Sequence, residues 1–335
     1  MSLIESTDSG LYCKQAGVYI DPWKKVDKAI ITHGHSDHSR PGHKAYACVH
    51  SSKAILKHRL GPINVTSYAY GDSFSVNGVR FSFHPAGHII GSAQIRVEYQ
   101  GEVWVVTGDY KLDDDGISEA FEQLQCHSFI TESTFGLPVY NWPDQHTVYN
   151  DINNWWSENA EAGQTSLLTA YSLGKAQRIL HHLDIDIGPI YCHGAIANMN
   201  DALIEAGVKL PYYEKITTDL KPDDYKNALV LAPPAATGSA WMKRFKQVSI
   251  GVASGWMALR GARRRRGADR GFILSDHCDW KGLNQAIKAT GAENIYPTHG
   301  YTEIFSKWLT SEGYNAQPIE TAFIGESLET ETEVQ

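Results

Sequence analysis

The sequence lacks long hydrophobic runs and any excess of positive charge. No stretch of its 335 residues is long and apolar enough to cross a bilayer, and its start has no basic segment followed by an apolar one. The formal net charge of -8 means that binding to nucleic acid would require a local basic surface. We therefore expect a cytoplasmic protein that makes no membrane contact.

Cysteine is scarce as well. The five cysteines are scattered, odd in number and form no Cys-x-x-Cys pair, which argues against a disulfide framework and for a reducing compartment. Hydrophobic residues make up 42% of the chain and charged residues 20%, as in soluble globular proteins. The length allows one large core with a substantial insertion.

Histidine, in contrast, is concentrated in residues 33–38, which read His-Gly-His-Ser-Asp-His. Imidazole nitrogens and carboxylate oxygens bind zinc and similar ions, and catalytic sites keep one coordination position open for water. The preceding residues 29–32 are apolar or β-branched, so the stretch is predicted to follow a buried strand. In a loop there, its first two histidines can reach one ion while Asp37 and His38 turn toward a second.

Further metal-binding side chains follow other predicted strands. His88 lies in a glycine-containing turn, and it either completes the shell of the first ion or is an ordinary solvated histidine. Asp109 and Glu132 each come at the end of an apolar strand, as do His277 and His299. A carboxylate in this position can bridge two cations, and we predict that role for Asp109.

Asp21 precedes a proline at the end of another predicted strand. Two interpretations of it stay open. The carboxylate either orients a ligand histidine through the free N–H of the ring, or it forms a turn.

The pattern of predicted elements changes along the chain. Many short strands before residue 136 predict sheets that are stacked on one another. An amphipathic helix over residues 144–162 then opens an alternation of strands and helices, which predicts a second, smaller α/β unit with parallel strands. A strand over residues 272–274 is expected to return the chain to the first unit, and the acidic residues 326–335 are expected to be disordered.

Two stretches are candidates for binding a polyanion. One is a run of arginines, the only concentrated basic patch in this acidic chain. Its guanidinium groups either bind phosphate oxygens or form a solvated loop. The other is a strand-to-helix connection whose backbone N–H groups could hold a phosphate, although an ordinary helix cap is the alternative. The candidate residues are Arg263, Arg264, Arg265 and Arg266 of the first stretch and Ser172 and Lys175 of the second.

The ordered set of these motifs resembles the metallo-β-lactamase superfamily and, within it, the β-CASP nucleases. The set is His33, His35, Asp37, His38, His88, Asp109, Glu132, His277 and His299. The resemblance covers nearly the whole chain. It implies an α/β protein in which a metallo-β-lactamase αββα sandwich, residues 1–136 and 268–325, is interrupted by a smaller α/β β-CASP cap domain, residues 137–267.

The resemblance also implies roles for the residues. One divalent ion would be held by His33, His35, His88 and Asp109, and the other by Asp37, His38, Asp109 and His299. Zinc is expected, with manganese as the alternative. Glu132 and His277 match the family's own markers, which assist proton transfer around the scissile phosphate, so the catalytic set would be Asp37, Asp109, Glu132 and His277. The late histidine is kept by the RNA-cleaving members and missing from Artemis and the crosslink-repair nucleases, so its presence implies a complete two-metal site.

The implied function is phosphodiester hydrolysis by two-metal activation of water. Residues 171–177, the arginines and residues 274–280 resemble those of the bacterial ligase-associated DNA exonucleases. We therefore expect a 5′-to-3′ exonuclease of DNA repair that prefers single strands or free DNA ends, with a DNA ligase and a helicase as partners by resemblance. An RNA-processing nuclease with the same site is one alternative, and a hydrolase of small thioesters or lactams is another. A structural metal protein is disfavoured, because such sites are closed and thiolate-rich.

Overall fold

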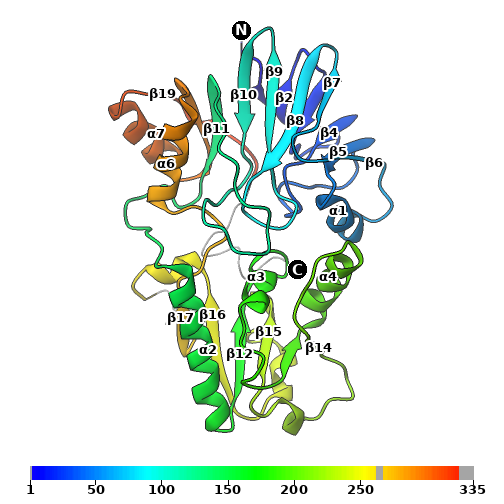
Figure 1. Cartoon of the computed structure of the whole chain (residues 1–335), viewed down its shortest axis with the longest axis vertical. Helices are drawn as coiled ribbons and strands as arrows, with labels where there is room; N and C mark the ends of the chain where they lie inside the picture. Colours follow the sequence, from blue (N-terminus) through cyan, green and yellow to red (C-terminus); the bar gives the residue numbers. More distant parts are fainter. Residues whose placement is uncertain (1, 262–266, 324–335) are drawn as a thin grey trace. The chain divides into compact units, whose positions relative to one another are not determined.

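The computed structural model describes residues 2–261 and 267–323, and these divide into two compact units (Figure 1). Unit 1 runs up to Tyr140 and resumes at Asp276, and unit 2 is the segment Asn141–Ser275 between them. The predicted tail, residues 326–335, lies outside the described residues. No described helix has both the length and the apolar character needed to cross a membrane.

Unit 1 contains two sheets, as the density of short strands predicted. The first has the order β1 (Glu5–Thr7), β2 (Gly10–Cys13), β3 (Val18–Ile20), β4 (Lys28–Ile30), β5 (Ala45–Val49), β6 (Val65–Tyr68). The second has the order β19 (Asn315–Ala316), β18 (Asn294–Gly300), β11 (Ser128–Ser133), β10 (Glu102–Val106), β9 (Ala93–Tyr99), β8 (Val79–Pro85), β7 (Ser73–Val76). Strands β10, β11 and β18 are mutually parallel.

Alternate residues of these strands face opposite layers. Ile30 of β4 and Ile130 of β11 belong to one core that both sheets share, whereas Ala29 packs with α1 (Ser52–Leu60) on the outer face of the first sheet. On the outer face of the second sheet, Phe129 packs with α6 (Trp280–Thr290) and α7 (Thr302–Ser311), which are drawn in orange to brown in Figure 1. Burying apolar side chains on both faces of each sheet is the main stabilising contribution here.

Unit 2 has one sheet in which every strand pair is parallel, as the alternation of strands and helices predicted. Its order is β14 (Glu214–Lys215), β13 (Ile190–Cys192), β15 (Leu229–Ala232), β12 (Thr165–Thr169), β16 (Val248–Ala253), β17 (Arg270–Phe272). One face is covered by α2 (Gln145–Glu161), α3 (Lys175–His181) and α4 (Gly194–Glu205). The other face carries the short 3-10 segments η1 (Pro222–Tyr225), η2 (Pro234–Ala236) and η3 (Ala240–Arg244), while η4 (Gly255–Ala258) follows β16.

The unit boundaries differ from the expected ones at residues 136 and 267. Strand β17, which was expected to return the chain to the first unit, pairs with β16 of unit 2, so the chain enters unit 1 only at Asp276. The reason is that both units contain parallel strands, and β17, whose three residues read Arg-Gly-Phe, carries no signal that selects its partner. Strands β1 and β2 and helices α1 and α7 were not expected from the sequence.

Candidate metal centre

The predicted metal-binding residues all lie in unit 1, at the carboxyl ends of its strands or in the loops that follow them. Asp109 follows β10, Glu132 lies near the end of β11, and His299 lies near the end of β18. Because these three neighbouring strands are parallel, their carboxyl ends meet at one edge of the sheet, where α/β proteins usually bind ligands. The loop after β4 brings the 33–38 stretch to the same centre.

The first group of ligand atoms consists of His33, His35, His88 and Asp109, all within 4.8 Å of one another. Oδ2 of Asp109 lies 3.5 Å from Nε2 of His33 and 3.7 Å from Nε2 of His88. The Nε2 atom of His88 is 3.1 Å from Nδ1 of His35. These are the four residues that the resemblance implied for one ion.

The second group consists of His38, Asp109 and His299. Oδ2 of Asp109 lies 3.5 Å from Nε2 of His38, and its Oδ1 lies 3.1 Å from Nε2 of His299. Asp109 therefore belongs to both groups, the position predicted for a bridging carboxylate. Asp37 was expected in this group. Its Oδ2 is 3.7 Å from Nε2 of His38. The half-buried side chain of Asp37 is not, however, among the residues whose ligand atoms all lie within 4.8 Å of one another.

The carboxylate of Asp21 orients the first loop. Its Oδ2 is 2.8 Å from Nδ1 of His38, and its Oδ1 accepts a hydrogen bond from the backbone N–H of Thr32 at 2.8 Å. The Thr32 hydroxyl donates to Asp21 and also lies 3.0 Å from Nδ1 of His33. Of the two interpretations left open for Asp21, the structure thus supports the one in which it holds a ligand histidine.

Two further contacts involve Asp276 and His277, where the chain re-enters unit 1. Nδ1 of His88 lies 2.8 Å from the backbone oxygen of Asp276. Nδ1 of His277 lies 2.8 Å from Oε2 of Glu132, whose Oε1 accepts from the backbone N–H of Tyr110. Glu132, His277 and Asp109 also form a third set of ligand atoms within 4.8 Å.

The donor set fits one or more divalent ions. The Nε2 atoms of His33 and His38 are buried and make no hydrogen bond among the described residues. Burying a polar nitrogen without a partner is unfavourable, and an ion in the centre would supply one. Imidazole and carboxylate ligands suit zinc and manganese.

Electrostatics favour positive charge in the centre. Burial lowers the pKa of His33 and of His88 well below its ordinary value, so both rings are neutral, as metal ligands must be. Burial also disfavours charge on His38, but neighbouring carboxylates, Asp109 foremost, outweigh it and raise the pKa of His38 to about 10. Burial raises the pKa of Asp109, yet His38 and His299 outweigh that effect and hold the pKa well below its ordinary value.

Two further side chains near the centre were missed from the sequence. Arg59 of α1 donates hydrogen bonds to the backbone oxygens of Gly34 and Ser39. These bonds hold the histidine loop near both of its ends. Thr134 places its Oγ1 atom 3.0 Å from Nε2 of His299. Arg59 gave no signal because α1 itself was not predicted, and Thr134 looked like one polar residue among several at the end of a strand.

The candidate nucleic-acid contacts lie in unit 2 or outside the described residues. Lys175 is buried, with its Nζ atom 5.0 Å from the centre of the Tyr171 ring. Ser172 is half-buried, and its backbone oxygen accepts a hydrogen bond from Gln177. The candidate arginines Arg263, Arg264, Arg265 and Arg266 lie outside the described residues.

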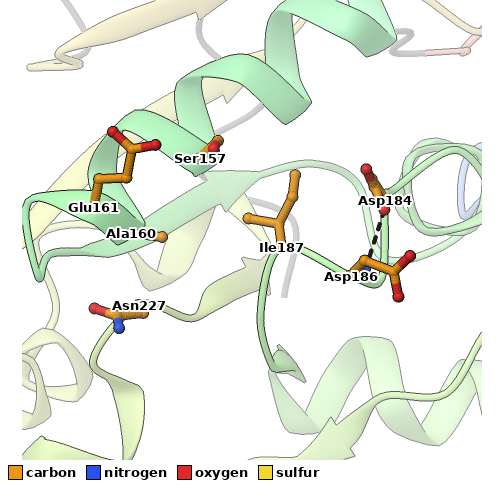
Figure 2. A pocket seen from close by; sticks show the side chains of 7 residues that line it. All are labelled: Ser157, Ala160, Glu161, Asp184, Asp186, Ile187 and Asn227. Atoms are coloured by element: carbon orange, nitrogen blue, oxygen red, sulfur yellow. Dashed lines mark hydrogen bonds between the residues drawn. The ribbon is translucent and has the colours of Figure 1, made fainter.

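Unit 2 also has a pocket of about 460 Å³, shown in Figure 2. It lies between α2, which contributes Glu161, and the connection that carries Asp184 and Asp186. It contains none of the predicted site residues. Its three carboxylates would repel phosphate groups, so we do not assign nucleic-acid binding to it.

Known proteins resemble the chain over different lengths. It is 29% identical to a probable DNA ligase of Opitutus terrae over 314 residues, which cover 92% of this chain and 30% of that protein. It is 27% identical to an RNase J-like protein of Methanocaldococcus jannaschii over 185 residues, 47% of this chain and 43% of that protein. It is 25% identical to the cleavage and polyadenylation specificity factor subunit 3-I of Arabidopsis thaliana over 220 residues, 53% of this chain and 31% of that protein. The chain therefore spans less than half the length of each of these relatives.

These similarities and the geometry of the centre agree with one family. They support the β-CASP nuclease family of metallo-β-lactamase-fold proteins as the family of this chain. No family model matches the chain. A solved structure of a protein of unknown function from Enterococcus faecalis shares its fold with a TM-score of 0.64 and 14% identity, covering 87% of this chain and 78% of that one.

Proposed function

We propose that the chain is a metal-dependent nuclease that hydrolyses phosphodiester bonds in DNA. The observation that carries the proposal is Asp109, whose two carboxylate oxygens face two separate groups of histidine nitrogens. Two divalent ions held side by side stabilise the negative charge of a phosphate and lower the pKa of water, which is the chemistry that phosphodiester hydrolysis needs. No nucleophilic side chain is then required.

The chain's own residues divide the remaining work. We assign the first ion to His33, His35, His88 and Asp109, and the second to Asp37, His38, Asp109 and His299. His277 is the proton donor to the leaving oxygen. Its bond to Glu132 orients the ring and stabilises the positive charge that the ring carries before it gives up the proton. Zinc is the proposed metal and manganese its alternative.

DNA is favoured over RNA by the extent of the similarities. The resemblance to part of a probable DNA ligase extends over 92% of this chain, whereas those to the RNase J-like protein and the cleavage factor subunit cover about half. The same comparison supports a DNA ligase as a partner. On the resemblance of the sequence motifs we further propose a 5′-to-3′ exonuclease activity on single strands in DNA repair, with unit 2 as the β-CASP cap. An RNA-processing nuclease is the second candidate, because two of these relatives are named for RNA metabolism.

A cleavage assay tests the proposal. Single-stranded DNA and RNA of matched sequence, labelled at either end, are incubated with protein from which metal has been removed by chelation and then restored as zinc or manganese. We expect metal-dependent shortening of DNA from its 5′ end, with RNA spared. Internal cuts in RNA would support the second candidate, and hydrolysis of neither polymer would refute both.

A further inference from the structure

A strap of residues 317–323 extends the second sheet of unit 1 toward the metal centre. Strand β19 pairs in parallel with the start of β18. Beyond it, the backbone N–H of Gln317 donates to Ile295 at 3.1 Å, and that of Ile319 donates to Pro297 at 3.0 Å. The strap therefore advances along β18 toward its carboxyl end, where His299 lies.

Two other contacts hold the strap in place. The side chain of Ile319 packs against the core shared by the two sheets. The hydroxyl of Ser6 donates to the backbone oxygen of Glu320 at 2.8 Å. Backbone pairing, apolar packing and a bond from the first sheet together fix where the strap ends.

At its end, Phe323 contacts the second group of ligands. Its ring is stacked on the imidazole of His38, with centres 4.3 Å apart and an angle of 18°. It meets His299 edge-on at 5.9 Å and Trp23 edge-on at 5.6 Å. Among the described residues, its ring contacts include none of the histidines of the first group.

We propose that Phe323 is a positioning residue for the second metal ion, which the strap brings onto His38. The inference rests on the two-ion centre of the proposed function. The bond from His38 Nδ1 to Asp21 fixes one edge of the imidazole ring, and the stacked phenyl ring restricts rotation about that edge. With both restraints, Nε2 points at Asp109 before an ion arrives, so less ordering is required on binding.

Phe323→Ala should weaken the binding of the second ion alone. Orienting partners of metal ligands typically change affinity by about 10- to 100-fold, and we expect a loss of that size for the second ion and none for the first. Phe323→Tyr keeps the stacked ring and should behave as the wild type. Phe74→Ala is the matched control, because Phe74 is also half-buried in unit 1 and stacked on an aromatic ring, that of Tyr68, away from the ligands.

The test is a calorimetric titration of the chelated full chain with manganese, without nucleic acid, and a count of bound ions after dialysis. Retention of both affinities in Phe323→Ala, or equal weakening of both, would overturn the inference while leaving the proposed function intact. A wild-type chain that binds no second ion would overturn both. An unchanged titration accompanied by weaker binding of metal-free protein to single-stranded DNA would also overturn it, since Phe323 would then be a stacking platform for bases.

Discussion

The two ligand groups that share Asp109 differ in how they are built. Three of the four residues of the first group come from residues 33–88, and its orienting contacts are a hydroxyl and a backbone oxygen. The second joins His38 to His299 from the far end of the chain, and its orienting contacts are the carboxylate of Asp21 and the ring of Phe323.

The difference extends to charge. His33 is neutral because burial lowers its pKa, whereas carboxylates raise the pKa of His38 to about 10. The histidines His33 and His88 of the first group are thus neutral, whereas the carboxylates around His38 favour positive charge in the second group. The second group has several supports, each of which can be removed separately.

Replacing Asp109, which both groups share, should abolish binding of both ions. In Asp109→Asn, both groups lose a carboxylate, and we expect loss of both ions and a fall in turnover of about 10⁴-fold, as when other essential catalytic groups are removed. Metal content and the cleavage assay measure the two effects. Asp27→Asn, a change at an exposed aspartate in the same unit, is the control, and retention of two ions by Asp109→Asn would disprove the bridging role.

Removing the proposed proton donor should leave both groups intact. For His277→Ala we expect turnover to fall by about 10²- to 10⁴-fold, the usual contribution of general acid catalysis, with both ions retained. Metal analysis beside single-turnover rates tests this. Because His277 also belongs to the set with Asp109 and Glu132, loss of an ion would identify it as a ligand instead.

Removing the charge of Asp21 should weaken binding of the second ion and leave binding of the first unchanged. Asp21→Asn keeps the shape of the side chain but removes its charge and one acceptor, so we expect the second ion to bind about 10- to 100-fold more weakly. The free energy of unfolding should fall by about 1–3 kcal/mol, because a buried donor loses its acceptor. Titration with manganese and denaturant unfolding measure the two changes. Equal weakening of the first ion would show that Asp21 supports the whole loop through Thr32 rather than His38 alone.

The candidate ligands were easier to predict from the sequence than the residues that hold them in place. Candidate ligands such as His33 and Asp109 could be predicted because a polar side chain of a metal-binding type directly after an apolar strand is a local signal. Phe323 and Arg59 carry no such signal, since an aromatic or basic residue acquires its meaning only when strand pairing or a helix brings it to the site. The parallel sheet of unit 2 followed from alternation, but the partner of β17 did not, because pairing between distant strands is decided by the whole fold.

The four candidate arginines should contribute to nucleic-acid binding without affecting either ligand group. Replacement of Arg263, Arg264, Arg265 and Arg266 by serine should weaken binding of single-stranded DNA and leave both ions in place. Each phosphate contact contributes about 0.7 to the slope of log affinity against log salt concentration for single strands, so the slope should become shallower by up to about 2.8. Fluorescence anisotropy across a series of salt concentrations measures it, and serine replacement of Lys243 and Arg244, basic residues of η3 in the same unit, is the control. An unchanged slope would show that the arginines form a solvated loop, and a changed metal content would show that the ligand groups are not independent of unit 2.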